Sequence, residues 1–198
     1  MSFVDKVVAA VTPPETEGQR REAREKALAA AGTGDWLALI LEQHVQIEHA
    51  FIAVKAAPDL ASRLAAQKEL ATLLTGHSNA EEAVIYPALV HFGHKTHGMA
   101  GYTEQAGAKA NMGALEYLDP MSQDYLDKLE HIRGAVAHHM YEEESDRFLD
   151  LKQLAAPDQE RLTQRFREEF ERYIGADQSA GRALGETTRG NASRSIPH

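Results

Sequence analysis

The sequence predicts an all-α protein whose core is an up-down four-helix bundle. Apolar residues recur at spacings of three and four in the long segments, which is the period of an amphipathic helix. No segment alternates between apolar and polar residues as a half-buried strand does. Proline or glycine separates one periodic segment from the next, so we expect consecutive helices to pack antiparallel.

A helical extension is predicted to precede the bundle, over residues 1–34. Residues 2–11 have a short amphipathic pattern that stops before Pro13. Thr16, with Gln19 three residues later, is typical of the capping box that begins a helix. The helix that follows is charged and rich in alanine. Because its apolar face is weak, we expect it to lie across the bundle rather than inside it.

Two long helices begin the bundle domain, which we place at residues 35–175. The first covers about residues 36–57 and ends before Pro58. The second covers about residues 61–92, with a bend in its last turn at Pro87. The first helix carries a clear apolar stripe: Leu37, Ile40, Leu41, Ile47, Phe51 and Val54.

Residues 93–101 are predicted to connect the two halves of the bundle. The third helix, over residues 102–118, has few large apolar side chains and several glycines and alanines, which permits close packing. The fourth helix covers about residues 122–151. A fifth helix is expected to begin near Pro157 and to end before Gly175.

The last segment, residues 176–198, is rich in Gly, Ser, Thr and Arg. This composition buries little apolar surface, so we expect a loosely held tail unless a partner orders it.

Composition excludes several classes of function. The chain has 198 residues and no cysteine, which excludes disulfides, thiolate metal sites and cysteine nucleophiles. Its net charge of −9 argues against a nucleic-acid or membrane surface. No segment approaches the roughly 18 apolar residues of a membrane-spanning helix, and the first residues lack the features of a signal peptide. The cytoplasm is therefore the expected location.

A histidine followed four residues later by a glutamate occurs in three predicted helices: His44 with Glu48, His77 with Glu81, and His139 with Glu143. Residues four apart share one helix face, about 5–6 Å apart at Cβ, so one imidazole and one carboxylate can reach the same ion. All three histidines continue apolar stripes, where buried polar groups are costly without partners. We therefore predict that the three helices direct these side chains inward at a shared metal site.

The chemistry of these ligands indicates the metal. Imidazole and carboxylate without sulfur favour iron or manganese, with zinc as an alternative. Glu81 and Glu143 come from different helices, and each could bridge two ions, so two irons are predicted. A bridged pair supplies two electrons, which suits dioxygen or peroxide. The Glu-x-x-His motif of ferritin-type bundles is absent.

Neighbouring polar residues are predicted to face outward. Glu82, Glu142 and Glu144 are expected on solvated helix faces. His49 and His138 each lie next to the residues of the motif, and one step along a helix turns a side chain by about 100°.

Together these residues resemble the hemerythrin-like (HHE cation-binding) domains, over about residues 35–173. The resemblance is carried by the three His-x-x-x-Glu pairs, by the second glutamate after two of them, and by the aromatic residue that follows. It implies a non-heme centre of two oxo- or hydroxo-bridged irons, held by His44, His77, Glu81, His139 and Glu143. It also implies dioxygen binding, iron or oxygen sensing, or reaction with peroxide or nitric oxide.

One position departs from the family pattern. The third helix of the family usually carries Glu-His-x-x-x-Lys, and here Gln105 stands where the histidine is expected. Tyr102 could ligate as a phenolate one turn earlier, or His97 could turn in if the helix began sooner. Otherwise the centre would keep an open position or hold one metal. Glu48 is expected to be an additional ligand or to support one.

We therefore expect a hemerythrin-like di-iron protein that binds or reacts with a small oxidant, and a catalase-like decomposition of peroxide is one activity open to it. Two alternatives remain at this point. One is an iron or oxygen sensor that signals to a protein partner through the tail or the N-terminal helices. The other is a metal-free helical interaction module. A homo-oligomer is compatible with each of them.

Overall fold

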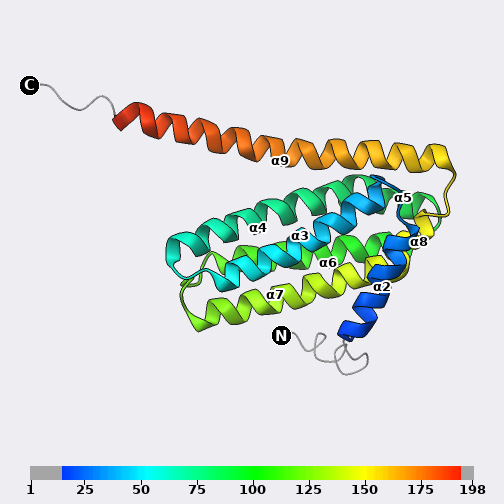
Figure 1. The fold of residues 1–198 in the computed structure, drawn as a ribbon, viewed down its shortest axis with the longest axis horizontal. Coiled ribbons are helices and arrows are strands. Elements are labelled where there is room, and N and C mark those ends of the chain that lie inside the picture. Colours follow the sequence, from blue (N-terminus) through cyan, green and yellow to red (C-terminus); the bar gives the residue numbers. More distant parts are fainter. Residues whose placement is uncertain (1–14, 193–198) are drawn as a thin grey trace, which may run out of the picture.

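The computed structural model describes residues 15–192 of the chain, and its side chains as far as residue 175. Four long helices lie side by side and form the bundle (Figure 1): α3 (Trp36–Ala56), α4 (Leu60–Ala80), α6 (Lys95–Leu115) and α7 (Gln123–Glu142). No strand occurs in the described range, which confirms the predicted all-α bundle. The short helix predicted at residues 2–11 lies outside the described residues.

Short polar side chains fix where the bundle helices begin. Asp35 accepts a hydrogen bond from the backbone N–H of Ala38 at the start of α3, at 2.9 Å. Asp59 and Ser122 cap α4 and α7 in the same way. A side-chain oxygen at this position satisfies a backbone donor that has no partner within the helix.

Two of the bundle helices continue into π-helical turns. In η1 (Glu81–Ile85), which leads into α5 (Tyr86–His91), the N–H of Tyr86 donates to the carbonyl of Glu81. In η2 (Glu143–Arg147), which leads into α8 (Phe148–Leu151), the N–H of Phe148 donates to the carbonyl of Glu143. Each π turn therefore begins at the glutamate of a His-x-x-x-Glu pair. Such insertions are frequent at functional sites.

The bend predicted at Pro87 takes a different form. The irregularity lies in η1, before the proline. Pro87 itself occupies the first turn of α5, where a missing N–H costs little.

The connection predicted at residues 93–101 is wrong, because α6 already begins at Lys95. Two glycines let this early part of α6 approach α5. A Cβ on Gly98 would lie 2.9 Å from the backbone oxygen of Tyr86, and one on Gly101 would lie 2.6 Å from Cζ of the Tyr86 ring. The close packing expected of this helix is thus found at its N-terminal end.

Two further helices complete the fold. The helix α2 (Glu17–Ala30) begins with the predicted capping box and crosses the end of the bundle near α8 and η2. The helix α9 (Ala156–Ala192) lies along α4 and α3 (Figure 1). It continues past Gly175, so its predicted end is wrong, while the loose attachment of residues 176–198 stays a prediction. None of the helices in the described part of the chain is long and apolar enough to cross a membrane.

The apolar core has two parts with a polar layer between them. Along α3, Ile40 and Leu41 belong to one cluster, which also holds Trp36 and Phe148. Ile47, about two turns further along, belongs to the other. The buried His44 lies between them. The candidate functional residues that were predicted from the sequence therefore lie in the middle of the bundle, with apolar packing at both ends.

Candidate metal centre

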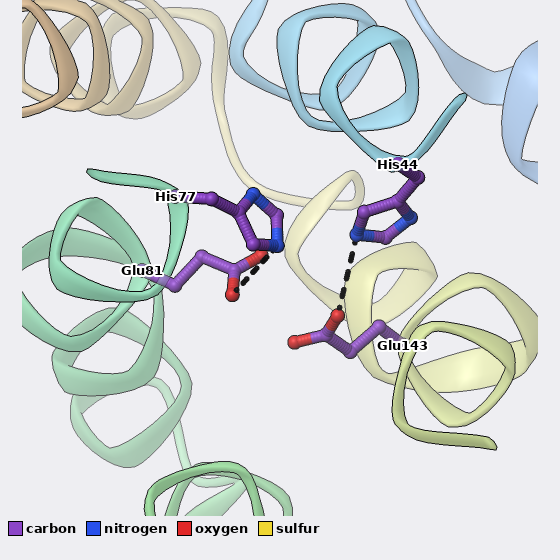
Figure 2. Close-up of side chains that lie close together, drawn as sticks. All are labelled: His44, His77, Glu81 and Glu143. Atoms are coloured by element: carbon purple, nitrogen blue, oxygen red, sulfur yellow. Dashed lines mark ion pairs between the residues drawn. The ribbon is translucent and has the colours of Figure 1, made fainter. Parts of the chain in front are cut away.

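Four buried side chains converge in this polar layer (Figure 2). His44 comes from α3, His77 from α4, and Glu81 and Glu143 from the first residues of the two π turns. One ligand atom of each lies within 4.8 Å of a ligand atom of every other. His77 Nε2 is 3.4 Å from Glu81 Oε2, and His44 Nε2 is 3.5 Å from Glu143 Oε2. The structure therefore brings together four of the residues that the sequence predicted as ligands.

His139 and Tyr86 adjoin this group. The Nε2 atom of His139 lies 3.3 Å from Glu143 Oε1. The hydroxyl of Tyr86, fully buried, lies 3.1 Å from the same nitrogen and donates to Glu143 Oε1 at 2.9 Å. It also lies 3.3 Å from Glu81 Oε2. One phenol oxygen thus touches three of the predicted ligands.

Several ligand atoms in this group have no hydrogen-bond partner in the protein. His44 Nε2, Glu81 Oε1 and Glu143 Oε2 are all buried and unpartnered. Leaving a buried polar atom unpaired costs about 1–3 kcal/mol, and more for a charged group. Three such atoms facing one another fit a metal ion, which would accept electron pairs from all of them. Nitrogen and oxygen donors without sulfur suit iron, manganese or zinc.

The opposite ring nitrogen of each histidine is held by a polar group. His44 Nδ1 lies 2.7 Å from Glu144, His77 Nδ1 lies 2.9 Å from Gln43 Oε1, and His139 Nδ1 lies 2.7 Å from Glu104. Such contacts orient the ring and leave the other nitrogen free to bind a metal. All three Nε2 atoms point to the shared centre.

Arginines complete these contacts further out. Arg24 of α2 donates to Glu144 at 2.7 Å, and Arg147 of η2 donates to Glu104 at 2.9 Å. Burial alone would raise the pKa of Glu104, but hydrogen bonds from His139 and Arg147 lower it to about 2. Glu104 therefore stays ionised and holds a proton on His139 Nδ1.

The electrostatics of the metal-free centre are unfavourable. Burial, together with the charge of Glu143, raises the pKa of Glu81 well above its ordinary value. Burial, together with the electrostatic influence of the neighbouring His44 and His139, lowers the pKa of His77. Burial opposes charge on His44 too, but Glu143 and Glu144 outweigh it and raise its pKa to about 9. Two buried carboxylates facing one another favour the binding of a cation.

Two predicted ligands lie outside the group. Glu48 is half-buried and pairs with Arg24 at 3.0 Å, which links it to Glu144 rather than to the centre. Tyr102 donates its hydroxyl to the backbone carbonyl of Glu82 at 2.7 Å. Its ring packs against the ring of Tyr86, with centroids 5.1 Å apart. Glu48 is therefore linked to Glu144 through Arg24, and Tyr102 packs against Tyr86 instead of reaching the centre.

The substitutes considered for Gln105 have different positions. The helix α6 does begin early, as the His97 alternative required, but His97 turns toward Asp150, 3.5 Å away. His94 lies 2.9 Å from the same carboxylate, and the three form a separate, partly exposed group. Gln105 is buried and donates to Glu81 Oε2 at 2.6 Å.

Several residues of the site were not predicted from the sequence, among them Glu104, which holds His139. Glu144 was predicted on a solvated face, but it is buried against His44. Gln43, which holds His77, was not singled out. Tyr86 was noted only as the aromatic that follows a motif. Its position five residues after Glu81 could have identified it, because a π turn places the fifth residue on the same helix face as the glutamate.

Other predicted orientations agree with the structure. His49 and His138 are exposed, as their positions beside the motif required. Glu82 and Glu142 lie at the surface of the bundle in ion pairs with Lys109 and Arg147.

Comparison with known proteins identifies the type of fold. No family model matches the chain, and no curated protein matches it. Among solved structures, the chain is similar to a hemerythrin HHE cation-binding domain-containing protein from Mycobacterium kansasii, with a TM-score of 0.66. The fold is hemerythrin-like. The sequence identity is 21%, and the match covers 75% of this chain and 92% of the other. The predicted resemblance is thus confirmed for the fold, and the buried histidine–glutamate group within it fits a metal site.

Proposed function

We propose that this hemerythrin-like protein holds two iron ions in the bundle and uses them to bind or to reduce a small oxidant. The observation that carries this proposal is the convergence of buried, unpartnered nitrogen and oxygen atoms on one point. A pair of irons, when bound, supplies two electrons to dioxygen, peroxide or nitric oxide. The name of the Mycobacterium kansasii protein, which refers to cation binding, is consistent with this use of the fold.

The ligands proposed are the three histidines, His44, His77 and His139, with Glu81 and Glu143 between them. These carboxylates arise from different helices and face one another, so each can be shared between two ions. Tyr86 takes the role that the sequence gave to Tyr102, because its oxygen contacts both carboxylates. An imidazole, carboxylate and phenolate set favours iron over zinc.

The remaining residues of the centre orient these ligands and exclude water. Glu104 and Glu144 hold the outer nitrogens of two histidines, and the arginines that bind them keep both glutamates ionised. The surrounding apolar clusters leave His44, Glu81 and Glu143 with no solvent exposure. Electrostatic interactions between charged groups are therefore strong within the centre, because little water screens them.

Metal content tests this proposal directly. Protein purified with added iron is expected to retain about two irons per chain, because two carboxylates and three imidazoles converge. His139→Ala should lower that content to about one or less, since removing a ligand weakens binding 10–100-fold or more. The exposed His131 on the same helix supplies the control, and His131→Ala should bind like the wild type. Wild-type protein without bound metal would contradict the proposal.

Two tyrosine variants test the phenolate ligand. Ferric protein is expected to show a visible phenolate-to-iron absorption band, because the Tyr86 hydroxyl lies among the ligands. Tyr86→Phe should remove the band, while Tyr102→Phe should retain it, since that hydroxyl binds a backbone carbonyl. Absorption spectra of the three iron-loaded proteins decide the matter. A band that persists in Tyr86→Phe and disappears in Tyr102→Phe would restore the original prediction.

A further inference from the structure

An apolar cavity leads from the surface of the bundle to the candidate metal centre. It lies between α4, α6 and α7 and has a volume of about 290 Å³. Three residues of the centre, His77, Gln105 and His139, form part of its lining. Lys109 and Glu116, both exposed, lie on its outer part.

The sequence of α6 explains why this space is not filled. Where a bundle helix would place large apolar side chains, α6 has Ala108 and Gly113. A Cβ added to Gly113 would meet no atom within 4 Å. Leu74, Met112 and Met140 supply much of the apolar wall, and the polar residues Gln67, Thr75 and Ser78 also line the cavity. Methionine adapts its shape to irregular ligands, which suits a binding wall.

The size of the cavity exceeds the needs of a diatomic oxidant. A single water-sized molecule requires only about 10–15 Å³ by the same kind of measure. Pockets for organic ligands begin at roughly 300 Å³, and this cavity, at about 290 Å³, is close to that size. Its walls are mostly apolar, so the ligand carries an apolar body.

One polar atom of a residue that lines the cavity has no hydrogen-bond partner. Gln105 is 4% exposed, and its Oε1 atom accepts no hydrogen bond. The amide nitrogen of the same side chain donates to Glu81 at 2.6 Å, which fixes the orientation of the amide. The free oxygen is therefore an acceptor, which the O–H or N–H of a ligand would satisfy.

The charges near the cavity disfavour anionic ligands. Lys109 Nζ is bound by Glu82 at 2.7 Å and by Asn79 at 3.1 Å, so its charge is already paired. Glu116 adds a negative charge on the outer part, which repels carboxylates. A neutral donor, such as a hydroxyl, satisfies Gln105 without burying a charge.

We propose that this cavity binds a neutral organic molecule with an apolar body and one hydroxyl or hydroperoxide group, which donates to Gln105 Oε1. Gln105, where the family usually has a histidine, is then a binding residue for this molecule rather than a lost ligand. The identification of this molecule as the substrate of the iron centre rests on the proposed function. The binding itself does not, because Gln105 and the apolar wall are parts of the chain that form the cavity without a metal.

The test compares two probes that differ by one group. 2-Phenylpropan-2-ol carries a hydroxyl where tert-butylbenzene carries a methyl, and the two have nearly the same shape. Calorimetry measures both affinities on the full chain, first as purified and then after chelation of metal. The alcohol should bind more tightly than the hydrocarbon by about 2–10-fold, because it makes one additional hydrogen bond. Gln105→Leu should abolish that preference. Cumene hydroperoxide, measured on the chelated protein, shows which of the two donor groups binds more tightly.

The methionine methyl groups locate the ligand. NMR signals of Met112 and Met140, which line the cavity, should shift on addition of the alcohol. Those of Met99 and Met121, which are exposed elsewhere, should not.

Two glycines of α6 give a matched pair of variants. A Cβ on either Gly113 or Gly107 would meet no atom within 4 Å, but only Gly113 lines the cavity. Gly113→Leu should weaken both probes at least tenfold, because its side chain occupies the space of the ligand, while Gly107→Leu should bind as the wild type does.

The proposal is overturned if the alcohol shifts neither Met112 nor Met140, or if Gln105→Leu keeps the preference for it. Failure of iron binding alone would overturn the proposed function and leave binding by the chelated chain intact.

Discussion

Replacing Glu81 with glutamine is expected to abolish metal binding and, at the same time, to stabilise the metal-free chain. Glutamine keeps the shape of the side chain but removes a fully buried carboxyl group that faces Glu143 and has to take up a proton when the metal-free chain folds. Without that carboxylate the centre loses one of its two shared ligands. The unfolding free energy of the metal-free protein should rise by roughly 1 kcal/mol, or about 2–4 °C in Tm.

The pH dependence of this effect follows from the raised pKa of Glu81. The ordinary pKa of the group is 4.5, and burial with the nearby Glu143 raises it in the folded chain. The native state then holds a proton that the unfolded state has released, so stability falls as the pH rises above 4.5. The advantage of Glu81→Gln should be largest near neutral pH and should vanish toward pH 4.5. Thermal unfolding of chelated protein across this range measures it.

The neighbouring residue supplies the control. Glu82 lies in the same π turn but pairs with Lys109 at the surface. Glu82→Gln should keep the full metal content and change stability by less than about 1 kcal/mol, as for other surface ion pairs. A Glu81→Gln protein that retains two metals, or that is less stable than the wild type without metal, would refute the assignment of Glu81.

Gly101→Ala is expected to destabilise the protein and to disturb the metal centre, although alanine is the better helix former. The added methyl would lie 2.6 Å from Cζ and 2.8 Å from Cε1 of the Tyr86 ring. That ring is fully buried and its hydroxyl is held by Glu143, so it has no free space to move into. Overpacking of this kind typically costs about 1–3 kcal/mol. Denaturant unfolding measures the loss, and the phenolate band should shift in the iron-loaded variant.

The same substitution two turns along α6 should have the opposite sign. A Cβ on Gly107 would meet nothing within 4 Å, so Gly107→Ala gains helix propensity without a clash. We expect it to stabilise the protein by about 0.5–1 kcal/mol. Equal stabilities of the two variants would show that Tyr86 is less firmly held than its contacts imply.

Much of the fold follows from local rules that act on the sequence alone. The apolar period predicted the helices of the bundle, and the caps Thr16 and Asp35 begin helices where they were expected. Four residues of the candidate site, including His44 and Glu143, also follow from the sequence, since a spacing of four on one helix face directs both side chains inward.

What the sequence by itself determined is thus the set of helices and the inward face of each one. The tertiary structure decided which side chains meet. It turned Glu48 toward Arg24, buried Glu144 against His44, and brought Tyr86 rather than Tyr102 to the centre. The physical reason is that helical periodicity fixes direction only within one regular helix. A π turn changes that direction, and the distance between helices depends on packing across the whole bundle.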